Sequence, residues 1–443
     1  MRFAAKLLLR WRACVIPGLL LIGVAAAQQT TPLPPLRLTL QDALARSRRN
    51  SVTYQSALMD AGVAREDKYQ ARAALLPSVT YNTSGIYTEG TGVNGGIKFI
   101  ANNAVHEYSS QGNVHEAIDV AGFAEFRRNG AAAAAARARS EIAARGLVVT
   151  VVQAYYGVAA AQLKLEVARN AADEGEHFLK LTQNLEHGGE VAHSDAIKAE
   201  LQRNDRLRQL REAELASLNA RLDLAVLIFP DLTDNFAIAE NLHAPAALPT
   251  LPEVQQLAAR DNPDIRAALE TAREAGYGVT VSRAGYLPSL SFDYFYGIDA
   301  THFATRTDGI SNLGSSVVAS VNIPIWNWGA TQSRVRQAEL RRDQAKRELS
   351  LAQRRLLAEL QSLYAEAEAA ASELTNLQRS TELAAESLRL TTLRYRDGEA
   401  TVLEVVDAQN TASLANSIYQ DGAVRFRVAL ANLQTLTGVL TTP

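Results

Sequence analysis

The chain has 443 residues, of which 47% are hydrophobic and 21% are charged, and its formal net charge is −2. This length would allow two or three ordinary domains, and the absence of a basic excess gives no case for nucleic-acid binding. The single cysteine, Cys14, lies near the N-terminus, so no disulfide or thiol chemistry is expected in the rest of the chain.

Residues 1–27 predict a cleavable secretory signal peptide. They combine a basic start, an apolar core and Ala25-Ala26-Ala27 before Gln28. A retained membrane anchor is the alternative. No later stretch approaches the roughly 18 consecutive apolar residues of a transmembrane helix, so any membrane crossing by the rest of the chain would use strands.

Residues 28–230 predict a first structural repeat that ends in a long helical hairpin. Its expected elements follow in chain order: an extended leader at 31–36, a helix at 39–75 broken near Asn50-Ser51, a β-hairpin at about 78–117 with a polar loop at 89–107, a long helix at 120–186, a tip at 187–195 and a return helix at 195–229. The long helix would measure about 100 Å at about 1.5 Å per residue. The two shorter helices, placed end to end, would nearly match it.

Residues 251–443 predict a second repeat of the same plan, after a Pro-rich linker at 231–250 that we expect to lie outside the helical columns. Gly189 aligns with Gly398, and Leu76-Pro77-Ser78 aligns with Leu287-Pro288-Ser289. In this half, Asn262-Pro263 marks the helix break, a β-hairpin is expected at about 289–323 and the tip at 396–404. A tandem duplication accounts for both matches.

The helix that begins near Gly329 carries an unbroken seam with a 3.5-residue period, which is typical of a coiled coil. Its members are Leu349, Gln353, Leu356, Leu360, Leu363, Ala367, Ala370, Leu374, Leu377, Thr381, Ala384 and Leu388. The sequence then predicts a glycine helix end at Gly398 and a new helix capped by Thr401.

Two segments near residues 290–298 and 313–323 alternate apolar and polar side chains over about 10 residues each, which is typical of tilted outer-membrane strands. Tyr294, Tyr296, Trp326 and Trp328 would supply interfacial aromatic belts. The first-half strands are less regular, and Glu116 falls where a lipid-facing residue is expected. An ordinary soluble β-hairpin in each half is the alternative.

Four strands are fewer than the roughly 8 of the smallest membrane barrels, and lipid tolerates no open sheet edge. The chain must therefore associate with copies of itself if the strands span a membrane. The strand pattern alone leaves a dimer and a trimer open.

Carboxylates gather where each return helix begins. Glu404 and Asp407 lie on one face of the first turn after the second tip, and Asp195 occupies the matching place after the first. These side chains would either form a charged mouth or simply match the positive end of the helix dipole.

The chain resembles the TolC-like outer-membrane efflux family. The resemblance rests on Asn262-Pro263-Asp264-Ile265, on Leu-Pro-Ser in both halves, on Pro324-Ile325-Trp326-Asn327-Trp328-Gly329 and above all on the segment from Tyr395 to Gln409. It covers nearly all of the chain after the signal segment.

This resemblance implies a mainly α fold with a β-barrel part. In it, a long antiparallel coiled-coil α-barrel joins four membrane strands per chain, and a homotrimer forms a 12-stranded barrel in outer-membrane lipid. It implies an efflux or type I secretion channel in the bacterial outer membrane that extends into the periplasm. The partners would be a periplasmic adaptor (membrane fusion) protein and an inner-membrane pump.

The resemblance also implies an iris at the periplasmic tips. Tyr395 would be a gate residue, with Asp195, Glu404 and Asp407 as gate or selectivity carboxylates. Gly188, Gly189 and Gly398 would mark the adaptor-docking tips. Some members of the family carry an arginine where Ala400 stands here, so one closing ion pair is not expected. Two alternatives remain open: Tyr395 as a packed coiled-coil residue, and the glycine turns as plain connectors.

No catalytic constellation is recognisable, so we expect no enzyme, no cofactor and no metal site. His187 and His193 flank the first tip, but a lone pair of exposed histidines is more often solvated than metal-bound. The alternative function is a soluble periplasmic coiled-coil adaptor or scaffold, whose strands would form a small sheet domain.

Overall fold

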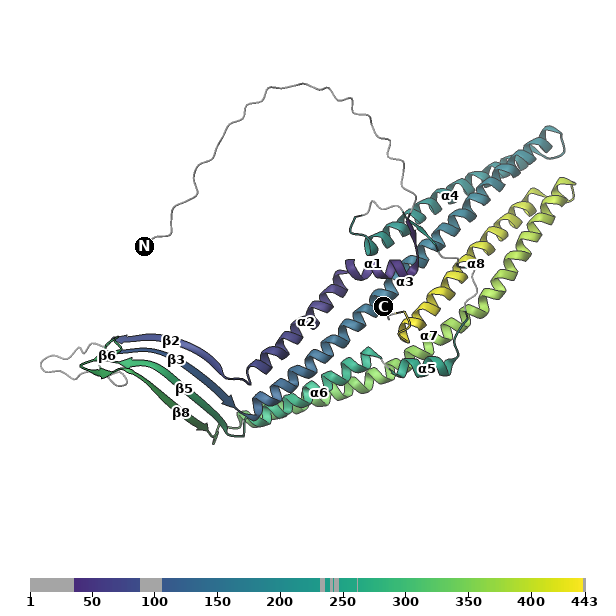
Figure 1. The fold of residues 1–443 in the computed structure, drawn as a ribbon. Helices are drawn as coiled ribbons and strands as arrows, with labels where there is room; N and C mark the ends of the chain where they lie inside the picture. Colours follow the sequence, from purple (N-terminus) through teal and green to yellow (C-terminus); the bar gives the residue numbers. More distant parts are fainter. Residues whose placement is uncertain are drawn as a thin grey trace, which may run out of the picture.

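The computed structural model describes residues 36–87, 106–231, 236–239, 242, 247–260 and 262–440. The predicted signal segment, almost all of the loop at 89–107 and much of the linker lie outside these residues. The molecule is elongated, with a β-sheet at one end and the tips of two helical hairpins at the other (Figure 1).

Both halves of the chain have the same order of principal elements. The first half runs α1 (Leu40–Asn50), α2 (Val52–Ala73), β2 (Ser78–Tyr87), β3 (His106–Ile118), α3 (Val120–His187) and α4 (His193–Ile228). The second runs α5 (Leu251–Arg260), α6 (Pro263–Ala284), β5 (Ser289–Ala300), β8 (Leu313–Asn322), α7 (Ala330–Arg396) and α8 (Val402–Leu436). The long helices α3 and α7 contain 68 and 67 residues, about 100 Å each.

The helix breaks follow local capping chemistry. Ser51 ends α1 and caps α2, since its hydroxyl accepts from the N–H of Tyr54 at 3.3 Å. Asn262 caps α6 through bonds from the N–H groups of Asp264 and Ile265, with Pro263 in the first turn. These caps divide α1 from α2 and α5 from α6. Each long helix packs along two shorter ones: α3 along α2 and α4, and α7 along α6 and α8 (Figure 1).

The predicted seam of α7 is largely buried. Of its twelve positions, Leu360, Ala367, Ala370 and Ala384 are buried, seven more are half-buried and Gln353 alone is exposed. Because the 3.5-residue period keeps one stripe toward the partner helix, this burial supports coiled-coil packing. Arg425 of α8 joins the same pair by ion pairs to Glu366 and Glu373 of α7, at 2.7 and 2.6 Å.

The largest core cluster lies midway along the columns, where α1, α3 and α4 meet a short parallel pair of strands, β1 (Leu36–Leu38) and β4 (Phe236–Ile238). The buried Tyr155 hydroxyl donates to the carbonyl oxygen of Leu38 at 3.0 Å. We expected the linker to lie outside the columns. Its described residues Phe236 and Leu242 instead belong to this core, because β4 pairs with β1 and carries them against the helices.

One helix among the described residues, α3, contains an 18-residue window that is long and apolar enough to cross a membrane by length and composition alone. Core helices of soluble proteins pass the same test. This finding is therefore weak evidence for a spanning helix.

The four long strands form one antiparallel sheet in the order β2-β3-β5-β8. A further short hairpin, β6 (Arg306–Thr307) with β7 (Ile310–Ser311), lies in the connection between β5 and β8. Within the described residues, β2 and β8 are the outer strands, so each presents one unpaired edge.

The register places most of the apolar side chains of β5 and β8 on one face, since directly paired residues share a face. Phe292 pairs with Ala319, Tyr294 with Val317 and Leu290 with Val321. Glu116 pairs with Phe292 and so lies on this apolar face, as the sequence pattern predicted. The opposite face is mostly polar. There Asp293 accepts from His115 at 2.8 Å and from Asn113 at 3.4 Å.

Candidate functional site

The two hairpin tips, at the opposite end from the sheet, end their long helices in the same way. The N–H of Glu190 donates to the carbonyl of Leu185 at 2.9 Å, and the N–H of Glu399 donates to that of Arg394 at 2.8 Å. Gly189 and Gly398 take left-handed φ values of +77° and +75°, as a glycine helix end requires. Gly188, by contrast, is an ordinary right-handed residue.

The second tip begins α8 with a reciprocal cap. The Thr401 hydroxyl accepts from the N–H of Glu404 at 3.3 Å, and the Glu404 carboxylate accepts from the N–H of Thr401 at 3.2 Å. The backbone and hydroxyl bonds from Thr401, and then the positive charge of Arg394, hold the pKa of Glu404 below its usual range. Glu404 thus has a structural role whatever else it does.

This cap predicts a pH dependence at the second tip. Because the folded-state pKa of Glu404 is depressed, its stabilisation is present above the ordinary glutamate pKa of about 4.3 and is lost as the pH falls through the folded value. We expect the protection factors of the amides in the first turn of α8, which correct for the intrinsic pH dependence of exchange, to fall over that window in the wild type but not in Glu404→Gln, which has no charge to titrate. An identical pH profile in the two proteins would contradict this assignment.

The other two predicted carboxylates have different surroundings. Asp195 is half-buried in the first turn of α4 and forms an ion pair with Lys198 at 3.1 Å. Asp407 is exposed on α8 and makes no side-chain hydrogen bond or ion pair with any described residue. Asp407 is therefore the one of the three carboxylates that makes no hydrogen bond or ion pair within the described chain, so no structural role accounts for it.

Tyr395 is a packed residue between the two hairpins rather than an exposed one. It is 3% exposed, and its ring lies 5.4 Å from that of Phe178 on α3. Its hydroxyl donates to Thr182 at 3.4 Å, which is longer than a typical O–H···O bond. Burial raises the pKa of Tyr395, and the nearby Asp195 adds to that shift. Ring packing is thus the stronger of its two links to the first hairpin.

A polar cluster that no sequence motif marks lies just inside the tips. Arg206 of α4 is 4% exposed and donates to Asn410 of α8 at 2.8 Å and to Gln209 at 3.0 Å. Burial lowers the pKa of Arg206 and raises that of Glu174, its neighbour on α3. Arg206 is one of several arginines in a highly charged helix, and no sequence pattern marks it as the buried one.

The tip histidines bond to neighbours in their own hairpin. His193 pairs with Glu186 at 2.6 Å, and His187 bonds the carbonyl of Gln183 at 2.6 Å. In the part of the chain that the structure describes, no group of three or more His, Cys, Asp or Glu side chains is placed to hold a metal ion.

The predicted interfacial aromatics lie at and beside the sheet. Tyr294 and Tyr296 are 43% and 53% exposed on its apolar face, within β5. Trp326 and Trp328 follow β8, are 75% and 88% exposed, and pack edge to face with ring centroids 5.8 Å apart. None of these four side chains packs into a hydrophobic core of its own chain.

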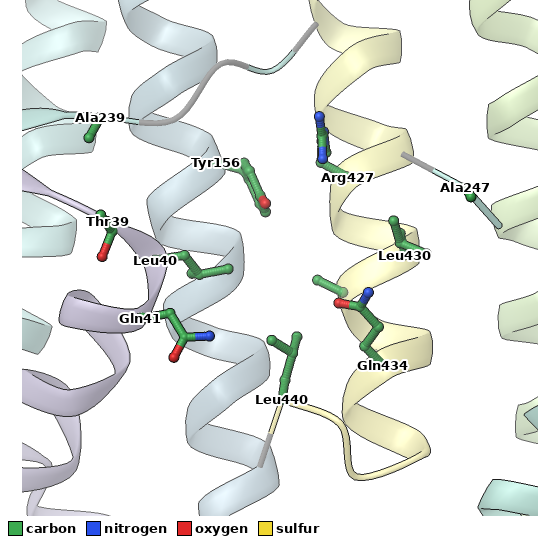
Figure 2. Close-up of a pocket in the computed structure, with 11 residues that line it drawn as sticks. Thr39, Leu40, Gln41, Tyr156, Ala239, Ala247, Arg427, Leu430, Gln434 and Leu440 are labelled. Atoms are coloured by element: carbon green, nitrogen blue, oxygen red, sulfur yellow. The ribbon is translucent and has the colours of Figure 1, made fainter. Parts of the chain in front are cut away.

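A cavity of about 550 Å³ lies between the two halves at mid-column, away from the tips. Figure 2 shows Tyr156 of α3 and Leu40 of α1 on one side of it, and Arg427 and Gln434 of α8 on the other. It holds none of the predicted site residues. Its lining mixes aliphatic, amide and guanidinium groups without an acid–base pair.

Comparison with known proteins links the second half of the chain to a family. The family model described as outer membrane efflux protein matches residues 254–439. This range includes the β5–β8 hairpin, the long hairpin of α7 and α8, and the second tip.

Similarity to individual proteins extends over both halves. The chain is 22% identical to the alkaline protease secretion protein AprF of Pseudomonas aeruginosa, over 91% of this chain and 85% of that protein. It is 25% identical to the outer membrane protein TolC of Vibrio cholerae, over 69% of this chain and 71% of TolC. The solved structure of the Campylobacter jejuni CmeC outer membrane channel matches the fold with a TM-score of 0.80 and 18% identity, covering 90% of this chain and 85% of CmeC.

Proposed function

Since the chain belongs to the TolC-like family of outer-membrane efflux proteins, we propose that it is the outer-membrane channel of an efflux or type I secretion system. Three copies would form one passive exit duct through periplasm and outer membrane. The relatives are channel proteins rather than enzymes, and the duct requires no cofactor.

The observation that carries this proposal is the open sheet. Its four strands have an apolar face, a polar face and, among the described residues, unpaired edges on β2 and β8. In lipid each unpaired backbone group costs several kcal/mol, so the edges must meet those of other copies. Three copies would close 12 strands around a polar lumen, a number that membrane barrels adopt.

At the other end, the glycine turns at Gly188, Gly189 and Gly398 would present the docking surface for a periplasmic adaptor, which would couple the duct to an inner-membrane pump. Docking would open the tips as an iris by separating the two hairpins. The buried contacts of Tyr395 and Arg206 join the hairpins and would oppose that movement.

The alternative, a soluble periplasmic adaptor or scaffold, is favoured by no observation on the fold or the relatives. One experiment distinguishes the two functions. The chain from residue 28 is added to planar bilayers after purification in detergent, and single-channel currents are recorded. Discrete conductance steps support the duct; release into the periplasmic fraction without detergent, with no conductance, supports the scaffold.

Asp407 is the carboxylate we propose as a selectivity ring, with one copy from each subunit. We expect Asp407→Asn to reduce the cation-to-anion permeability ratio roughly twofold or more and to weaken block by divalent cations. Asp60→Asn removes the same charge from an exposed position on α2, far from the tips, and should leave both quantities unchanged. Equal ratios in Asp407→Asn and the wild type would remove Asp407 from the selectivity site.

A further inference from the structure

Exposed cations without ion-pair partners gather at the helix ends next to the sheet. They lie on three of the four helices that meet it: Lys68 and Arg72 on α2, Arg127 on α3, and Arg334 and Arg336 on α7. None of the five makes an ion pair or side-chain hydrogen bond with a described residue. Many arginines farther along the columns do, including Arg203, Arg208, Arg389 and Arg425.

The acidic residues of this zone do not neutralise the five cations. Glu66, Glu125 and Glu339 already pair with Arg65, Arg128 and Arg283. Asp119 caps α3 through the N–H of Gly122. Asp67 is exposed and Glu116 at the end of β3 is half-buried, and neither pairs with a described residue. With Asp119 they place three carboxylates against the five cations, so positive charge is still in excess around the sheet end of the columns.

The depth of the cations matches a lipid headgroup layer. At about 1.5 Å per residue, all five lie within roughly 10 Å of the helix ends from which the strands depart. The headgroup region of one leaflet is about 5–8 Å thick, and charges act over a Debye length of about 10 Å at moderate salt. Exposed aromatic side chains occupy the same zone: Tyr69, Phe123, Tyr286, Trp326 and Trp328.

We propose that these five side chains, here called the basic collar, bind anionic phospholipid headgroups in the periplasmic leaflet of the outer membrane. Guanidinium groups suit the task, since they bind phosphate oxygens in a bidentate manner. The collar would fix the depth of the duct and enrich phosphatidylglycerol-type lipids around it. This inference rests on the proposed function, because it requires the strands to lie in lipid.

The chain supplies its own reporter for a test. It has three tryptophans, and Trp11 lies in the predicted signal segment, so the protein left after cleavage of residues 1–27 carries only Trp326 and Trp328, beside the collar. Its trimer is reconstituted into phosphatidylcholine nanodiscs that contain a fixed minor fraction of brominated phosphatidylglycerol or brominated phosphatidylcholine. Bromine quenches tryptophan only on close approach, so the ratio of the two quenching levels reports lipid preference at the collar.

We expect a preference for phosphatidylglycerol of about fivefold that falls as salt is raised. The variant K68Q/R72Q/R127Q/R334Q/R336Q should lose it. The matched variant R49Q/R169Q/R211Q/K346Q/R347Q should keep it; it removes five exposed, unpaired cations more than about 20 Å from the helix ends.

Equal quenching by the two lipids in the wild type, or an unchanged preference in the collar variant, would overturn the proposal. A preference lost equally in both variants would also overturn it, since net charge rather than the collar would then attract the lipid. Absence of quenching by either lipid would instead contradict the membrane location of the strands, and with it the proposed function.

Discussion

Gly297→Ala is expected to prevent the sheet from forming and to abolish the detergent-stable oligomer. A Cβ at residue 297 would lie 2.6 Å from Cα of Gln111 and closer still to the carbonyl oxygen of Ser110, both in the backbone of the paired strand β3. Backbone atoms cannot move aside without breaking the β3–β5 ladder. We expect a loss of at least about 3 kcal/mol, at the severe end for a one-carbon substitution.

Gly314 provides the matched control. It pairs directly with Gly297 from β8, and a Cβ there meets no heavy atom within 4 Å. Gly314→Ala should therefore assemble as the wild type does. The measurement is heat-modifiable migration on gels together with the melting temperature in detergent. A Gly297→Ala protein that assembles and melts like Gly314→Ala would show that the register of this sheet is wrong.

Tyr395→Ala is expected to loosen the tips and raise the resting conductance of the channel severalfold. The substitution removes a buried ring that packs on Phe178 across the two hairpins, and such aromatic truncations cost about 3–5 kcal/mol. Tyr395→Phe keeps the ring and loses only the 3.4 Å hydrogen bond to Thr182. Its conductance should stay close to that of the wild type.

The pair of variants separates the two interpretations of Tyr395. If packing holds the tips, only the alanine variant opens them in single-channel recordings. If Tyr395→Phe opens the channel as far as Tyr395→Ala does, the hydroxyl is the closing element and ring packing does not hold the tips shut.

The sequence was informative where structure depends on local chemistry or on a long period. The 3.5-residue seam, the glycine at residue 398 and the threonine cap at 401 are each decided within a few residues of chain. The strand alternation at 289–323 was equally local, and the structure has β5 and β8 within two residues of the expected segments. The two-fold repeat could be recognised because Gly189 and Gly398 mark matching turns.

Contacts between the halves could not be predicted in this way. The bond from Arg206 to Asn410 joins residues about 200 positions apart, and neither belongs to a motif. The same holds for Tyr395 with Thr182 and for the β1–β4 pair that draws the linker into the core. Such contacts depend on how two columns lie side by side, which a periodic pattern within one column does not determine.

The mass of the purified protein tests the central claim most directly. The chain from residue 28 would be extracted from membranes with detergent, and its protein mass measured by light scattering with the detergent contribution subtracted. The account predicts three copies per particle and precipitation when detergent is removed. A stable single copy in plain buffer would contradict it, because the open edges of β2 and β8 would then need no neighbour.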